Sequence, residues 1–301
     1  PGTTDTLITY HFVYDGIKDN WIKFGYSLKA RFLLHASNTT AFDANAILEA
    51  VANGIMQNSE NADITYSDAG EDVYNPWALV AIDQENSILD GWISEQLADA
   101  MNGATFGVVD PRMKFMFSAT DDGKFIGVRN GAGRGTGVDI SGDRSVISRD
   151  TYYAANTSPV LIITNAEMRF IEAEARLSLD DKPGAYNAYL AGIRAHMEML
   201  GVTASSIDTY INNPAVSVGA ANISLDLIMK EKYVALFLHP ETWNDARRYD
   251  YQYEDMTLPD NHNPELNGEF IRRQIYPDSE VSRNGANVPP VTLLDRMWWD
   301  Q

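Results

Sequence analysis

160-VLIITNAEMRFIEAEARLSL-179 and 183-PGAYNAYLAGIRAHMEML-200 decide the fold class of this 301-residue chain. In each stretch, apolar or small side chains recur every three or four residues, which places them along one face of a helix. Asp180 and Asp181 start the turn between the stretches, Pro183 suits the first turn of the second helix, and Gly201 ends it. The sequence therefore predicts a helix–turn–helix pair. Its apolar faces carry Ile163, Ala166, Phe170, Ala173 and Leu177, and then Tyr186, Tyr189, Ile193, Met197 and Leu200.

Helical patterns also occur before and after this pair. 20-NWIKFGYSLKARFLLHAS-37 and 43-DANAILEAVANGIM-56 predict a first helix pair over residues 20–56, with Asn20 as a cap. Downstream, Ser224 is expected to cap a long helix that runs to about residue 250. The predicted buried face of the first helix carries Trp21, Phe24, Leu28, Phe32 and His35.

Residues 57–158 have a different character. Gly, Asn, Asp and Ser are frequent there, helical periodicity appears only around 89–101, and a short strand is expected at 125–128. The segment is rich in aromatic residues, so disorder is not expected. We predict one mainly α-helical domain over 1–301, built on tetratricopeptide-like helix pairs. It contains a long insertion of loops and short strands at 57–158, a helix pair and long helix at 160–250, and an irregular tail at 251–301.

Composition excludes several kinds of protein. The chain has 23 Lys+Arg against 42 Asp+Glu, a net charge of −19, which disfavours nucleic acid as a partner. It has no cysteine, so it has neither disulfides nor thiolate metal sites. No apolar run reaches the roughly 18–20 residues of a membrane span.

Motifs of common enzyme classes are also absent. The five histidines show no close metal-ligand spacing, and neither a G-x-S-x-G elbow nor a Walker loop occurs. The cluster 131-GAGRGTG-137 lies in a predicted loop and lacks the flanking strand and helix of a phosphate-binding site. Glu167 and Glu174 share a helical face and leave a glycosidase pair open, although ion pairing with arginines is favoured. The acidic loops 68-DAGEDVYN-75 and 121-DDG-123 leave a structural Ca²⁺ open without EF-hand spacing, so the metal content is unknown and no other cofactor is expected.

The aromatic residues of the insertion give the best candidate binding site. In 72-DVYNPWALV-80, Tyr74, Asn75 and Trp77 lie on a loop that Pro76 is expected to stiffen. Aromatic faces stack on sugar rings while neighbouring polar groups bond the hydroxyls, so a glycan platform is one interpretation. The other is that the rings fill a small core beneath the loops. The candidate ligand-binding residues are Tyr74, Asn75, Trp77, Trp92, Tyr152 and Tyr153.

The stretch 239-HPETWNDARRYD-250 resembles an anion site at first inspection. Trp243, Arg247 and Arg248 are spaced so that they lie close together on a helix. We interpret them as structural residues whose arginines pair with carboxylates such as Glu167 or Glu174.

Eight short motifs occur in an order that resembles the SusD/RagB-like outer-membrane lipoproteins, in particular their SusD-like 2 branch. They are W-I-K-F-x-x-S-L-K-A-R at 21–31, D-P-R-M at 110–113, N-A-E-M-R-F-I-E-A-E-A-R at 165–176, Y-x-x-G-I at 189–193, E-K-Y-V-A-L-F at 231–237, E-T-W-N-D-A-R-R at 241–248, R-R-x-x-Y-P at 272–277 and W-W-D at 298–300.

This resemblance implies a helical, SusD-like α-α superhelix without catalytic activity. It implies a lipid-anchored protein on the cell surface of the outer membrane that passes oligosaccharides or peptides to a SusC-like TonB-dependent transporter. Family members are longer, with a lipoprotein signal, an anchoring Cys and further helix pairs before the W-I-K-F helix. We therefore interpret the chain as the C-terminal portion of such a protein, with the membrane anchor outside this sequence.

Three alternatives to glycan uptake stay open at this point. A peptide-binding member of the same uptake system would tolerate the net charge of −19 if its peptide were basic. A glycoside hydrolase would use carboxylates from the insertion. A helical-repeat scaffold would bind only other proteins.

Overall fold

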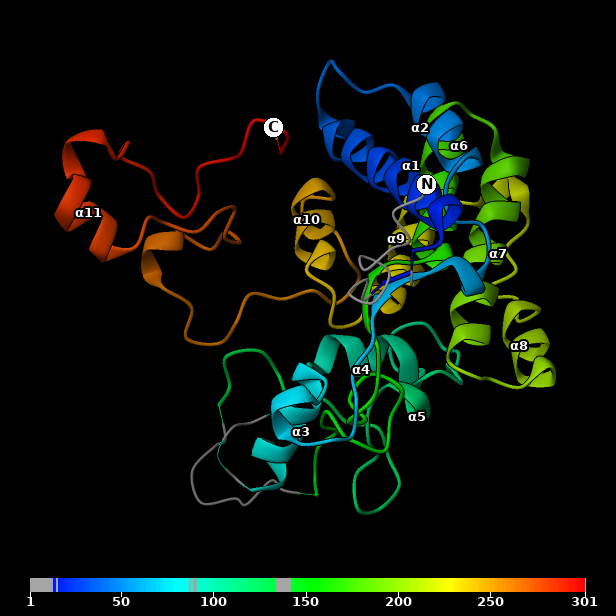
Figure 1. Cartoon of the computed structure of the whole chain (residues 1–301), viewed down its shortest axis with the longest axis horizontal. Helices are drawn as coiled ribbons and strands as arrows, with labels where there is room; N and C mark the ends of the chain where they lie inside the picture. The colour runs from blue at the N-terminus through cyan, green and yellow to red at the C-terminus, as the bar shows by residue number, and fades with distance from the viewer. Residues whose placement is uncertain (1–12, 15, 87, 89–90, 134–141, 301) are drawn as a thin grey trace, which may run out of the picture.

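The computed structural model describes residues 13–14, 16–86, 88, 91–133 and 142–300 (Figure 1). It is mainly helical, as predicted, with one small antiparallel sheet among the described residues. The helices are α1 Lys18–His35, α2 Ala44–Ala52, α3 Pro76–Glu85, α4 Glu95–Asn102, α5 Met113–Met116, α6 Asn165–Ser178, α7 Lys182–Met199, α8 Ala204–Ile211, α9 Leu225–Ala235, α10 Glu241–Arg248 and α11 Asp278–Asn284. The strands are β1 Ala62–Ile64 and β2 Val160–Ile163.

Helix α6 is the centre of the helical half. One of its faces packs with α1 and α2 through Met168, Ile171 and Ala175. Another packs with α7, α9 and the insertion, and includes Ala166 and Phe170. The predicted α6–α7 pair is confirmed. Helix α6 has two apolar faces, so other elements have to cover it on both sides.

Gly192 brings α7 close to α6. A Cβ at this position would lie 2.9 Å from the Phe170 ring, closer than such atoms approach in folded proteins. The glycine of Y-x-x-G-I is therefore needed for helix packing and not for a turn.

The first residues of 160-VLIITNAEM-168 form a strand and not the start of the helix. β2 pairs antiparallel with β1, and Thr164 then caps α6 by accepting a hydrogen bond from the Glu167 amide. The pairing holds the two ends of the 57–158 insertion together. Periodicity missed the strand because a short apolar run fits either type of element.

Helix α1 begins earlier and buries a different face from the one predicted. It starts at Lys18 after Ile17, so Asn20 is not its cap. Its buried residues are Ser27, Ala30, Arg31 and Leu34, whereas the side chains of Trp21 and Phe32 are 36% and 62% exposed. The face with small residues turns inward because it lets Arg31 reach the interior.

The predicted long helix from Ser224 to residue 250 is broken in two. α9 ends at Ala235 and α10 begins at Glu241. Leu238 between them has a left-handed backbone with φ of 59°. Pro240 has no amide hydrogen to continue the ladder, and it disfavours helical geometry at the residue before it.

The insertion contains more helix than predicted. The 72–80 segment is not a stiffened loop, because Asn75 caps α3 and Pro76 occupies its first turn. The helix expected at 89–101 is α4, which begins after Ser94, while residues 89 and 90 lie outside the described residues. The strand expected at 125–128 is reduced to an isolated bridge between Ser94 and Val128. Four residues of the glycine cluster, 134–137, also lie outside the described residues.

A buried arginine joins the insertion to the helical half. Arg112, which is 0% exposed, donates hydrogen bonds to the carboxylates of Asp110 and Glu231, and its Nη1 lies 3.2 Å from Nδ1 of His196. Burial alone would raise the pKa of Glu231, but Lys230 and Arg112 outweigh it and lower the value to about 2. Burial, and then Arg112, lower the pKa of His196, which keeps that ring neutral.

The tail after residue 253 lies to one side of the helices and carries α11 (Figure 1). Arg272 ties the tail to α10, because Arg247 donates to the Arg272 carbonyl at 2.9 Å and Arg272 donates to the Arg247 carbonyl at 3.0 Å. Arg272 also joins two other parts of the tail. The Arg272 amide donates to the Leu293 carbonyl at 2.8 Å, and the Arg272 guanidinium pairs with Asp300 at 3.3 Å.

We expect Gly192→Ala to destabilise the protein by about 1–3 kcal/mol, because the added methyl group overpacks the Phe170 ring. The matched control is Gly25→Ala on α1, where a Cβ meets nothing within 4 Å. There the better helix propensity of alanine should stabilise by up to about 1 kcal/mol. Urea denaturation measures both changes, and equal stabilisation by the two substitutions would contradict the packing argument.

Candidate functional site

The two arginines of 239-HPETWNDARRYD-250 have different surroundings. Arg248 is buried and pairs with Glu174 at 2.8 Å and with Asp245 at 2.7 Å. Lys232 pairs with the same two carboxylates, each at 2.8 Å. Burial would raise the pKa of Asp245, but Lys232 and Arg248 lower it to about 2. These four charges cross-link α6, α9 and α10, which is a structural role.

The partners of Arg247 and Glu167 differ from those predicted. Glu167 pairs with Arg31 of α1 at 2.6 Å and not with either arginine of the motif. The guanidinium of Arg247 lies between two indole rings, 3.9 Å from the centroid of Trp243 and 4.5 Å from that of Trp299. The motif therefore anchors the end of the tail on α10 and offers no open anion site.

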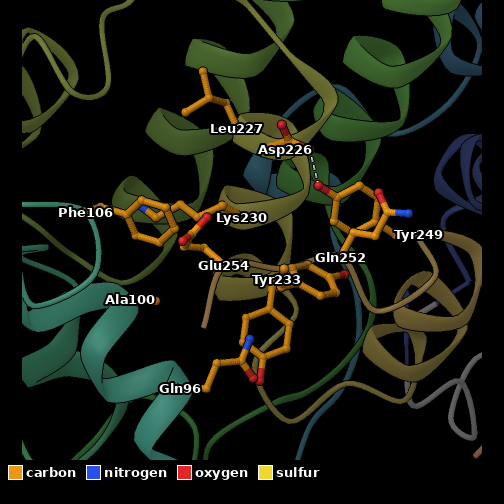
Figure 2. A pocket seen from close by; sticks show the side chains of 11 residues that line it. Gln96, Ala100, Phe106, Asp226, Leu227, Lys230, Tyr233, Tyr249, Gln252 and Glu254 are labelled. Carbon is orange, nitrogen blue, oxygen red and sulfur yellow. Dashed lines mark hydrogen bonds between the residues drawn. The ribbon is translucent and has the colours of Figure 1, made fainter. Parts of the chain in front are cut away.

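A cavity of about 220 Å³ lies where α4 of the insertion meets α9 and the segment after α10 (Figure 2). Figure 2 shows Phe106 and Tyr249 on opposite sides of the cavity, with Tyr233 between them. Its full lining is Gln96, Ala100, Phe106, Asp226, Leu227, Lys230, Tyr233, Tyr249, Gln252, Tyr253 and Glu254. We call it the aromatic cavity.

Local structure directs these side chains into the aromatic cavity. On α9 the lining residues Asp226, Lys230 and Tyr233 recur every three or four positions, so they share one helical face. After α10, Asp250 and Tyr251 have left-handed backbones with φ of 55° and 56°. This turn reverses the chain, so that the residues on either side of it, Tyr249 and Tyr253, both line the cavity.

The three tyrosines contact one another. The Tyr253 ring lies 5.0 Å from Tyr249, edge to face, and 5.2 Å from Tyr233. The Tyr249 hydroxyl donates to the Asp226 carboxylate, and burial together with this bond raises the pKa of Tyr249. Burial likewise raises the pKa of Tyr253 well above its ordinary value. The phenols stay neutral and present both ring faces and hydroxyl groups.

A second cavity of about 240 Å³ lies beside the first. Tyr233 lines both cavities, and the second also contains Trp92, Phe237 and Thr242. Aromatic side chains therefore line two cavities that share Tyr233. Such an arrangement suits an elongated ligand whose successive units meet successive rings.

The six predicted ligand-binding residues are not brought together. Trp92 lines the second cavity, but neither lining includes another of the six among the described residues. Asn75 is 0% exposed and donates to the Ser158 carbonyl. Tyr153 is 4% exposed, and its hydroxyl lies 2.9 Å from Nε2 of His196. Trp77 and Tyr152 pack against the large core, and Tyr74 is partly exposed beside Asp68.

The main residues of the aromatic cavity were missed by sequence reasoning. Tyr249 and Tyr253 lie outside the insertion, and Phe106 is one of its many aromatic residues. A usable signal was present, because Tyr233 lies inside E-K-Y-V-A-L-F and Tyr249 directly follows E-T-W-N-D-A-R-R.

The described part of the chain contains no group of three or more His, Asp or Glu side chains placed to hold a metal ion. In the two acidic loops, Asp68 accepts from Asn156 and Asp122 pairs with Lys124. No helix in that part is both long and apolar enough to cross a membrane.

A family model described as "Starch-binding associating with outer membrane" (SusD-like 2) matches residues 3–277. None of the curated protein sequences gives a significant match.

Solved structures similar to this chain include three SusD homologues. One from Bacteroides ovatus has a TM-score of 0.77 and 22% identity, covering 100% of this chain and 70% of its own. One from Bacteroides thetaiotaomicron has a TM-score of 0.77 and 20% identity, covering 100% and 69%. A chitin-binding homologue from Flavobacterium johnsoniae has a TM-score of 0.77 and 22% identity, covering 98% and 67%. These similarities show that the chain has the SusD-like fold.

We expect Arg248→Met to lower the free energy of unfolding by about 3–5 kcal/mol, because Glu174 and Asp245 would then share Lys232 alone. Adding Glu174→Gln should recover part of the loss, since one carboxylate would again face one cation. Chemical denaturation of both single variants and the double variant measures the coupling. Strictly additive losses would contradict the ion-pair assignment.

Proposed function

The chain belongs to the SusD-like 2 family, and from that premise we propose that it binds an oligosaccharide in the aromatic cavity and delivers it to a SusC-like TonB-dependent transporter. In this proposal the protein has no catalytic activity and is held at the cell surface of the outer membrane by a lipid anchor. Proteins of this family are binding proteins, and one similar structure is that of a chitin-binding protein.

The observation that carries the proposal is the convergence of four aromatic rings with polar groups at one cavity. Phe106, Tyr233 and Tyr253 are partly exposed and offer faces on which the C–H surfaces of sugars stack, and the buried Tyr249 ring supports them. Asp226, Gln96, Gln252 and Glu254 stand among them and supply hydrogen-bond partners for hydroxyl groups.

The neighbouring cavity extends the proposed site. Trp92 and Phe237 would contact sugar units that follow the one held at Tyr233. Tyr74, Trp77 and Tyr152 are partly exposed, and they remain predicted ligand-binding residues. Asn75 and Tyr153 are buried, so we leave them out of the proposed ligand surface.

A peptide is the alternative ligand, and the acidic residues Asp226 and Glu254 favour a basic one. A glycoside hydrolase that uses carboxylates of the insertion stays an alternative of another class, whereas the α6 pair Glu167 and Glu174 is disfavoured. The carboxylates of Glu167 and Glu174 are held in buried ion pairs with Arg31, Arg248 and Lys232, which leaves them unsuited to acid–base catalysis.

We expect Tyr233→Ala to weaken oligosaccharide binding by at least about tenfold, roughly 1.4 kcal/mol, because Tyr233 lines both cavities. Calorimetry against a panel of oligosaccharides measures this affinity. The control is Trp298→Ala, which removes an aromatic ring that is 66% exposed and lines neither cavity.

If Tyr233→Ala and the unsubstituted protein bound oligosaccharides with equal affinity, the aromatic cavity would not be the ligand site. Chromatography of the glycan after incubation tests for catalysis, and shortened products would overturn the binding-only function. Tighter binding of basic peptides than of any glycan would favour the alternative ligand.

A further inference from the structure

The charged residues that line the aromatic cavity are mostly acidic, and the acidic ones are more exposed than the basic one. Asp226 and Glu254 are exposed carboxylates. Lys230 is the one basic residue among the described residues of the lining, and it is only 9% exposed. A ligand in the cavity can therefore reach the two carboxylates, whereas the ammonium group of Lys230 is nearly inaccessible to it.

The positive charge of Lys230 is already satisfied inside the protein. Its Nζ donates to Glu231 at 2.6 Å and to the Tyr210 hydroxyl at 2.8 Å. It also lies 5.0 Å from the centroid of the Phe106 ring. Because Glu231 has a pKa of about 2, it stays ionised and balances Lys230 at any ordinary pH. The charge offered to a ligand is that of Asp226 and Glu254.

The rings add to this preference. The face of an aromatic ring attracts cations, by about 0.5–1 kcal/mol at exposed sites and more where water is excluded. Tyr233, Tyr249 and Tyr253 lie together, and the Tyr249 hydroxyl holds the Asp226 carboxylate at the edge of this cluster. A carboxylate fixed at the edge of an aromatic cluster fits an ammonium group.

We infer that the glycan taken by this cavity carries primary ammonium groups, as oligosaccharides with unacetylated amino sugars do. Asp226, at the edge of the tyrosine cluster, and Glu254, elsewhere in the same lining, each bind an ammonium group, while the apolar sugar face stacks on a ring. This inference rests on the proposed function and adds the chemical class of the glycan.

The same charges disfavour anionic glycans. A uronic acid or sulfated sugar would meet Asp226 and Glu254 with no accessible cation in the described lining to offset the repulsion. The net charge of −19 acts in the same direction, because it attracts cationic ligands over a longer range and repels anionic ones.

The test compares three oligomers of equal length and the same β-1,4 linkage that differ only at carbon 2 of each sugar. The substituent is an amino group in glucosamine oligomers, an acetamido group in chitin oligomers and a hydroxyl in cellulose oligomers. Calorimetry at a pH where the amino groups are protonated should give at least about tenfold tighter binding of the glucosamine oligomer. This preference should decrease as salt is added, since ions screen the carboxylates.

Two substitutions show whether the carboxylates of the cavity cause the preference for the glucosamine oligomer. Asp226→Asn and Glu254→Gln should each reduce the ratio of the affinity for the glucosamine oligomer to the affinity for the neutral oligomers several-fold. The matched control is Asp255→Asn, which removes one negative charge beside Glu254 from an exposed residue that does not line the cavity. It should leave the preference unchanged. Thermal melting checks that all three variants are folded.

The outcomes separate the two proposals. Equal or tighter binding of the neutral oligomers, or an unchanged preference in both cavity variants, would overturn the ammonium inference and leave glycan binding intact. Binding of none of the oligomers, nor of any other glycan, would overturn both. Tighter binding of a lysine-rich peptide than of the glucosamine oligomer would overturn the glycan class in favour of the peptide.

Discussion

The fully buried guanidinium of Arg112 is the constraint on which the rest of the structure depends. A charge in the interior is tolerated only when it is paired and hydrogen-bonded, and two of the three partners of Arg112 come from distant parts of the chain. Asp110 belongs to the insertion, whereas Glu231 lies on α9 and His196 on α7. Arg31 with Glu167, and Arg248 with Glu174, connect further pairs of helices in the same way. The pairing of Arg112 with Glu231 gives a physical reason why the D-P-R-M and E-K-Y motifs occur in one chain.

The aromatic cavity lies at the junction that Arg112 fixes. One wall comes from α4 and Phe106 of the insertion, and the other from α9 and the segment after α10. Lys230 belongs both to this wall and, through Glu231, to the Arg112 network. The geometry of the site therefore depends on the same buried charges that hold the insertion against the helices. A rigid junction of this kind preorganises a binding site at little entropic cost.

Sequence reasoning succeeded for the α6–α7 pair, because periodicity and turn residues act within a few positions of each other. The break between α9 and α10 was missed although Pro240 is a local signal for a helix end. The candidate site was mostly missed because its residues meet only through tertiary structure. Tyr249 and Tyr253 reach Tyr233 only because the chain reverses at Asp250 and Tyr251, and aromatic content alone did not separate core rings such as Tyr153 from cavity rings.

The hydrogen bond between the Arg272 amide and the Leu293 carbonyl affects how far the tail can vary in length. It makes residues 273–292 a closed loop whose ends are fixed while α11 lies at its far side, without buried residues. The entropy of closing a flexible loop depends only logarithmically on its length, so doubling the length costs about 0.6 kcal/mol. The chain can therefore accept or lose residues here at small cost to folding. Variation in length among related sequences should concentrate in this loop, and a fused reporter domain should be accommodated there without disturbing the aromatic cavity.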